Sequence, residues 1–130
     1  MKQVPGSIGY TELAYAKQNH LSYADVKNSS GNYVSPSIES ITEALATASI
    51  PDDFRFSMVN PPGGKAYPIS GTTWLLVYAE QKDHAKGEKL VQFLRWAYSD
   101  GEKLAPGLDY APLPEALIKR TLEKVQSIKY

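Results

Sequence analysis

The feature that most constrains the fold is an apolar run, the longest in the chain: Trp74-Leu75-Leu76-Val77-Tyr78-Ala79. Together with the two threonines before it, this run is rich in β-branched, aromatic and aliphatic residues, which predicts a β-strand over residues 72–78. A strand that is apolar at nearly every position is typical of a sheet covered on both faces. The sequence therefore predicts a buried strand in a parallel or mixed sheet under helices.

Four further segments predict the helices that flank this sheet. Thr11 can cap a short helix over residues 11–19, and Ser35-Pro36 has the capping hydroxyl and early proline of a helix start. Residues 85–99 carry a broad apolar face. Pro114 opens the last helix, whose apolar face holds Leu117, Ile118, Leu122 and Val125. We also expect a short strand within residues 54–59 and a hairpin or loop tip at residues 29–32. The fold class is α/β, with a mixed sheet and flanking helices.

Composition excludes several classes of protein. A hydrophobic content of 42% with 22% charged residues fits neither a disordered chain nor a membrane protein. The net charge is +0, so there is no electrostatic reason to expect nucleic acid as a partner. The absence of cysteine excludes disulfides, cysteine-ligated metals and thiol chemistry. Prolines and glycines interrupt the first ten residues, so we expect no signal peptide in this chain.

Residues with catalytic or metal-binding potential are sparse. His20 lies in a turn-rich region and His84 near a helix entry, and neither has a partner at metal-ligand spacing. We interpret both as solvated surface residues. The adjacent acids Asp52 and Asp53 fit a solvated loop better than a general acid–base pair. No set of nucleophile, base and oxyanion donor can be assembled, so we expect no catalytic residues, no metal site, no cofactor and no enzyme activity.

By residue type, the best candidate for an anion site is Ser70-Gly71-Thr72. Hydroxyl groups and unhindered backbone N–H groups bind oxyanions well, especially where they open a helix. Here the motif precedes the expected strand instead. We therefore favour a bend or bulge before that strand over a phosphate-binding role.

Four ordered blocks of the chain resemble one protein family. The first is Val4-Pro5-Gly6-Ser7-Ile8-Gly9-Tyr10, followed by Glu12 and Tyr15-Ala16-Lys17-Gln18-Asn19, with Ser7, Thr11 and Leu13 as departures from the family's pattern. The others are Asn32-Tyr33-Val34-Ser35-Pro36, then Tyr67-Pro68-Ile69 with Thr72-Thr73-Trp74-Leu75-Leu76-Val77, and finally Phe93-Leu94-Arg95-Trp96-Ala97-Tyr98, Gly101 and Leu108-Asp109-Tyr110-Ala111-Pro112-Leu113-Pro114. In this order they are similar to the C-terminal portion of the periplasmic phosphate-binding protein of phosphate ABC transporters, commonly called PstS.

The resemblance implies a two-lobed, type 2 periplasmic-binding-protein fold. Residues 1–34 would belong to the second lobe and its crossing strand, and residues 35–130 to the returning part of the first lobe. The family's phosphate ligands lie in upstream motifs, including an arginine followed by Asp-Gly-Ser-Gly-Thr, and this sequence has none of them. The triplet at residues 70–72 lacks the preceding Asp-Gly and arginine. We therefore expect no phosphate ligand in this segment, with Ser70, Gly71 and Thr72 as the remaining candidates.

On this basis we expect the C-terminal fragment, or a split subunit, of a phosphate-binding protein that contributes scaffold to phosphate binding and delivery. Its expected partners are the N-terminal portion or a second copy of itself, inorganic phosphate only when complemented, and the ABC permease. The resemblance also implies a periplasmic or extracytoplasmic location. The alternative is an assembly module of the same fold that binds no ligand, because a strand without partners is a template for association.

Overall fold

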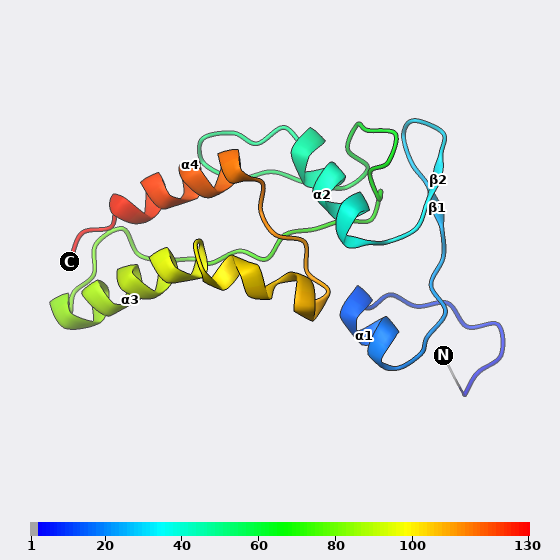
Figure 1. The fold of residues 1–130 in the computed structure, drawn as a ribbon, viewed down its shortest axis with the longest axis horizontal. Coiled ribbons are helices and arrows are strands. Elements are labelled where there is room, and N and C mark those ends of the chain that lie inside the picture. The colour runs from blue at the N-terminus through cyan, green and yellow to red at the C-terminus, as the bar shows by residue number, and fades with distance from the viewer. Residues whose placement is uncertain (1–2) are drawn as a thin grey trace.

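The computed structural model describes residues 3–130 and shows an elongated molecule in which helices dominate (Figure 1). Helices α3 and α4 run side by side along one half, while α1, α2 and a small hairpin occupy the other. In chain order the elements are α1 (Leu13–Gln18), β1 (Val26–Lys27), β2 (Tyr33–Val34), α2 (Ile38–Thr47), α3 (His84–Ala97), the 3₁₀ helices η1 (Gly101–Leu104) and η2 (Pro106–Leu108), and α4 (Glu115–Gln126).

Local capping explains where the helices begin. Ser37 caps α2: its side chain accepts a hydrogen bond from the Ser40 N–H, and the Ser40 hydroxyl accepts one from the Ser37 N–H. This capping box satisfies donors that the first helical turn leaves without partners. The predicted start at Ser35 is therefore two residues early. Asp83 caps α3 with a single bond, which its side chain accepts from the Lys86 N–H. The predicted Thr11 cap of α1 is wrong, because Glu12 occupies that position and makes no side-chain cap.

Two small apolar clusters hold the helices together. Val91 and Leu94 of α3 pack against Val125 of α4, with Leu90, Tyr98 and Ile128 around them. The second cluster joins α2 to the beginning of α4 and to the loops between them; its buried members are Ala44, Leu45, Met58, Ala66 and Leu117. The predicted apolar faces of the last two helices are confirmed by the burial of Val91, Leu94, Leu117 and Val125.

The only sheet among residues 3–130 is the antiparallel hairpin of β1 and β2, in which Val26 pairs with Val34 and Lys27 with Tyr33. The expected tip at residues 29–32 is confirmed. Two isolated bridges lie outside this hairpin and pair Val59 with Ile69 and Glu80 with Lys129. The mixed sheet predicted from the sequence is not formed within the described residues.

The predicted strand over residues 54–59 is also wrong. Phe54 has a φ of 58° and Asn60 a φ of 47°, values in the left-handed region that breaks an extended strand at both ends. Only Val59 takes part in a bridge. The alternation of apolar residues there serves burial instead, since Met58 is buried and Phe54 and Phe56 pack against the α2 cluster.

The largest departure from prediction concerns residues 72–78. They follow an extended path between the α3 and α4 ribbons (Figure 1), but they form no strand and their large side chains are not buried. The exposed fraction of each residue from Trp74 to Tyr78 lies between 36% and 96%. The physical reason is the lack of a neighbouring strand: within the described residues, no backbone N–H from residue 71 to residue 79 donates a hydrogen bond.

The total exposed surface also shows that this chain leaves apolar segments uncovered. The molecule exposes 9374 Å², whereas a compact folded monomer of 14.3 kDa exposes about 6,800 Å². The structure thus exposes about 2,600 Å² more than a compact monomer of its mass. None of the helices within residues 3–130 combines the length and apolarity that a bilayer crossing requires.

Candidate functional site

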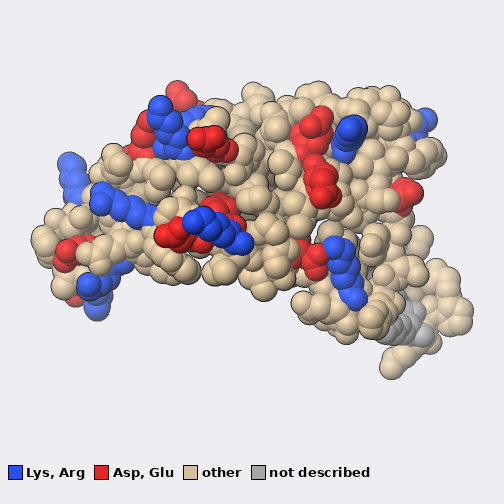
Figure 2. Space-filling view, in the orientation of Figure 1, with Lys and Arg blue, Asp and Glu red and all other residues tan. Residues whose placement is uncertain are grey.

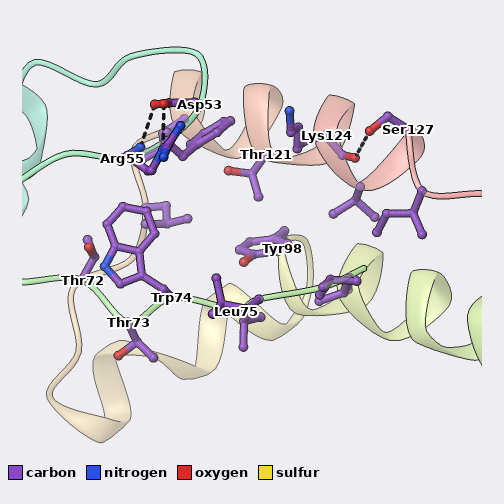
Figure 3. Close-up of a pocket in the computed structure, with 18 of the residues that line it drawn as sticks. Asp53, Arg55, Thr72, Thr73, Trp74, Leu75, Tyr98, Thr121, Lys124 and Ser127 are labelled. Carbon is purple, nitrogen blue, oxygen red and sulfur yellow. Dashed lines mark hydrogen bonds and ion pairs between the residues drawn. The ribbon is translucent and has the colours of Figure 1, made fainter. Parts of the chain in front are cut away.

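A cavity of about 470 Å³ opens between the extended segment and the helices. One wall is the segment 53–56 and another is the segment 72–77, while α3 and α4 form the floor with Leu94, Leu117 and Val125. Figure 3 shows Trp74, Leu75 and Tyr98 converging on this space from the extended segment and from α3. We call this space the apolar hollow.

Two aromatic rings meet across the hollow. The centroids of Phe56 and Trp74 lie 5.1 Å apart with their planes at 73°, an edge-to-face arrangement. Such pairs contribute roughly 0.5–1.5 kcal/mol beyond the area they bury. This contact joins the two extended walls, which share no backbone hydrogen bond in the described part of the chain.

The polar groups at the hollow are already engaged or lie apart from one another. The Asp53 carboxylate accepts hydrogen bonds from the Arg55 backbone N–H at 3.0 Å and the Arg55 Nε at 2.9 Å. These bonds, the backbone one first, lower the pKa of Asp53 below its ordinary value. The Ser127 hydroxyl donates to the Lys124 carbonyl oxygen at 2.7 Å. Burial raises the pKa of Tyr98, which lies on the floor.

The hollow therefore has the lining of a packing surface. A small-molecule site of this volume normally combines apolar walls with a few polar groups aimed at the ligand. Here the charged pair is bonded to itself, and the threonines are divided between the extended segment, which carries Thr72 and Thr73, and α4, which carries Thr121 (Figure 3).

The sequence-predicted anion candidates lie just before this segment. The Ser70 side chain is turned back on its own loop, where its hydroxyl donates to the Tyr67 carbonyl oxygen at 2.8 Å. Gly71 has open space around the position of a Cβ atom, and Thr72 is half-buried. No helix begins at this triplet, and none of the hydrogen bonds that lysine and arginine side chains donate among residues 3–130 goes to it. The positive charge and convergent N–H groups of an oxyanion site are not assembled here.

The histidines do not come together either. His20 is exposed in a turn, and His84 is the first residue of α3, where its ring lies edge-on to Tyr130 with centroids 5.4 Å apart. Within the part of the chain that the structure describes, no three metal-ligating side chains cluster. Figure 2 shows acidic and basic side chains interspersed on the face it presents, and no patch of one sign.

Sequence reasoning missed one residue that organises the opposite end of the molecule. Asn28 is buried, and its Nδ2 donates to the carbonyl oxygens of Gly63, Gly64 and Ala66 at 3.1–3.2 Å. Its Oδ1 accepts from the N–H groups of Ser30 and Asn32, both at 3.1 Å. Asparagine ahead of a Ser-Ser-Gly turn is a signal for a side chain that bonds the local backbone, but not for the contact with residues 63–66.

Comparison with known families decides the class of this chain. The model of the PBP superfamily domain matches residues 1–101. The chain belongs to the PBP superfamily. This membership fits the helices and small sheet seen here, and it agrees with the family resemblance found in the sequence.

Individual relatives of this PBP superfamily chain are phosphate-binding proteins. It is 40% identical over 122 residues to the phosphate-binding protein PstS of Xylella fastidiosa (strain 9a5c), which covers 92% of this chain and 34% of the relative. Proteins of the same name from Methanocaldococcus jannaschii and Pasteurella multocida are 37% and 33% identical over 99% and 92% of this chain, each across 36% of the relative's length. The chain thus spans about a third of the length of these relatives.

Proposed function

We propose that this chain is the C-terminal portion of a phosphate-binding protein of an ABC transporter, present as a fragment or as one subunit of a split protein. The observation that carries this proposal is the alignment of nearly the whole chain with about a third of several phosphate-binding proteins. The apolar hollow and the unpaired segment beside it support it, because they are surfaces that a further part of the same protein would cover.

In this proposal the chain contributes scaffold and not phosphate ligands. Residues 1–34 supply a segment of the second lobe and the crossing strand, and residues 35–130 supply the returning part of the first lobe of a two-lobed, type 2 fold. Ser70, Gly71 and Thr72 are not expected to bind phosphate, since the Ser70 hydroxyl donates to Tyr67 and none of the described hydrogen bonds from a lysine or arginine side chain goes to the triplet. Inorganic phosphate is bound only when the remaining portion completes the site.

The same proposal sets the partners and the location. The complemented protein would deliver phosphate to an ABC permease, outside the cytoplasm, as the family resemblance implies. We propose no enzymatic role, because the side chains at the hollow include no nucleophile with an adjacent base.

One observation favours a second candidate, an assembly module that binds no ligand. The surplus of exposed surface, including five consecutive large apolar residues at positions 74–78, fits association with another chain whether or not phosphate is present. Self-association through these residues would be one form of this function.

Titration calorimetry distinguishes the two candidates. We expect this chain alone to show no phosphate binding at micromolar concentrations. Mixed with the portion of the Xylella fastidiosa relative that lies outside the matched residues, it should bind one phosphate per complex with micromolar or tighter affinity. Micromolar binding by the isolated chain would overturn the scaffold role. A stable complex that ignores phosphate would favour the assembly module.

A further inference from the structure

We propose that Lys17 and Asp109 form a latch that holds residues 3–25, here called the arm, against the rest of the chain, and that this latch raises the phosphate affinity of the complemented protein. The latch itself concerns this chain alone. Its effect on affinity rests on the proposed function, in which the arm belongs to the second lobe and Asp109 to the first.

The arm has little apolar attachment to the rest of the molecule. Ala16 is its only buried residue, and neither apolar cluster contains a residue of the arm. Its described backbone hydrogen bonds all stay within residues 3–25. Figure 1 shows α1 set apart from α3 and α4, beside the 3₁₀ helices that follow α3. Units without a large apolar interface move relative to one another by default, so the position of the arm depends on its polar contacts.

Two of these polar contacts join the arm to the residues that follow η2. The Lys17 ammonium donates to the Asp109 carboxylate, and the two side chains remain 41% and 27% exposed. This hydrogen bond raises the pKa of Lys17, and the charges of Asp109 and Glu39 add to the effect. The charge of Glu12 raises the pKa of Tyr110, with burial and a hydrogen bond between the two side chains adding to it. Two residues of the arm therefore interact with two consecutive residues 92 or more positions later.

The backbone at Asp109 is bent in a way that allows both contacts. Asp109 has a φ of 61°, in the left-handed region that aspartate and asparagine adopt more readily than most residues. The turn is closed by hydrogen bonds from the Asp109 N–H to the Pro106 carbonyl oxygen at 3.1 Å and from the Tyr110 N–H to the Ala105 carbonyl oxygen at 3.0 Å. Such conformations persist where the surrounding structure fixes them, and they cluster at functional sites. The acceptor of the latch is thus held in place before the arm meets it.

The strength of this contact suits a reversible latch. A partly exposed ion pair shifts an equilibrium by no more than about fivefold, and the arm can leave without disturbing either apolar cluster. Binding proteins with two lobes close around their ligand by a hinge motion. In the proposed function, the contact between Lys17 and Asp109 forms when the lobes approach and is lost when they separate. It therefore favours the closed arrangement and lowers the Kd for phosphate by the same factor.

The free chain tests the latch without phosphate. Because the chain has no cysteine, Gln18→Cys on α1 and Lys119→Cys on α4 each accept one spin label at an exposed position. Pulsed electron paramagnetic resonance should give a narrow distribution of distances between the two labels. Lys17→Glu places a like charge beside Asp109 and should broaden this distribution. Lys17→Arg retains the charge and should keep the distribution narrow.

Another ion pair provides a matched control. The Lys103 Nζ lies 2.7 Å from the Asp100 Oδ1, both side chains are exposed, and both residues belong to the η1 region. Lys103→Glu breaks this pair without touching the arm, so it should leave the distance distribution unchanged. Asp109→Asn removes the charge of the acceptor while asparagine tolerates the left-handed backbone. It should broaden the distribution, although less than Lys17→Glu does.

Titration calorimetry measures the effect on affinity. The probe is inorganic phosphate, added to this chain mixed with the portion of the Xylella fastidiosa relative that lies outside the matched residues. We expect Lys17→Glu to raise the Kd for phosphate by about fivefold at low salt and by less at high salt, because exposed charges are screened. Lys103→Glu should change the Kd by less than about twofold.

The results separate this inference from the proposed function. A distance distribution that does not respond to Lys17→Glu, or that responds equally to Lys103→Glu, overturns the latch. An arm that Lys17→Glu releases while the Kd for phosphate stays the same or falls overturns the role in affinity. If no mixture binds phosphate, the proposed function fails and the role in affinity fails with it, whereas the distances in the free chain still decide whether Lys17 holds the arm.

Discussion

The β1–β2 hairpin and the segment 71–79 are both extended, yet only the hairpin strands pair through their backbones. The hairpin strands contain only four residues, Val26, Lys27, Tyr33 and Val34, and are only partly apolar, but they pair with each other. Asn28 then fastens their tip to residues 63–66. The segment 71–79 is far more apolar, but its backbone forms no strand and its side chains remain largely exposed.

This difference shows what apolarity does and does not specify. An apolar run indicates where burial is favourable, at about 25 cal/mol per Å² of apolar surface. It does not supply the neighbouring backbone that a strand needs for its hydrogen bonds. Each hairpin strand has its partner six to eight residues along the chain, whereas no described residue of this chain lies beside residues 71–77 as a strand.

The largest expected effect compares two leucines that both line the hollow. Leu94 is buried between α3 and α4, so Leu94→Ala should lower the free energy of unfolding by about 3 kcal/mol, through lost transfer energy and the resulting cavity. Leu75→Ala removes the same atoms from an exposed position and should cost less than about 0.5 kcal/mol in the free chain. Urea denaturation followed by circular dichroism measures both.

A Leu75→Ala cost close to that of Leu94→Ala would contradict the comparison, because it would mean that the free chain buries the extended segment after all. With the complementary portion bound, the two costs should converge. In that state the unfolding of the complex, followed at fixed concentrations of both chains, should respond to either substitution.

The second prediction tests the hairpin. Asn28→Ala removes three donated and two accepted hydrogen bonds at a buried position and should cost about 2 kcal/mol. Asn32→Ala removes one side-chain bond, to the Gly64 carbonyl oxygen at an exposed position, and serves as the control with a cost below about 1 kcal/mol. Thermal unfolding of both variants gives the comparison; equal costs would show that Asn28 does not organise the tip.

The helical part of the fold could be predicted closely from the sequence. The apolar faces of α3 and α4, the proline before α4 and the hairpin tip all depend on neighbours within a few residues, and local patterns encode such neighbours directly. The errors were shifts of one or two residues at helix starts. At α2, Ser35 and Ser37 are both capping residues by type, and the reciprocal bonds with Ser40 select the second.

The strands and the site could not be predicted in the same way. The residue types from Thr72 to Tyr78 predict a buried strand. Strand pairing, however, depends on a neighbouring backbone segment that local residue types do not specify. The triplet at residues 70–72 has suitable groups for an anion, yet the Ser70 hydroxyl bonds to Tyr67 and no helix N-terminus follows. The contact between Phe56 and Trp74 joins segments 18 positions apart, and no local pattern marks it.

The smallest effect concerns a contact that, like the hairpin, this chain completes by itself. Lys17 of α1 donates to the Asp109 carboxylate 92 residues later, and both side chains are partly exposed. This hydrogen bond raises the pKa of Lys17 above its ordinary value of 10.5. A raised pKa means that the folded state holds the proton more tightly than the unfolded state. The stabilisation is therefore fully present below the unfolded pKa and is lost as the pH rises through the folded pKa.

Lys17→Met should accordingly destabilise the chain slightly at pH 7 and make no difference at strongly alkaline pH, where Lys17 of the parent chain has also lost its charge. Lys119→Met on α4, where no ion pair is seen among the described residues, is the matched control and should be neutral throughout. Urea denaturation at several pH values and two salt concentrations measures the difference, which should also shrink with added salt because exposed charges are screened. A difference that persists unchanged at high pH and high salt would assign the effect of Lys17 to the packing of its aliphatic stem, and the ion pair would then contribute nothing to holding α1 in place.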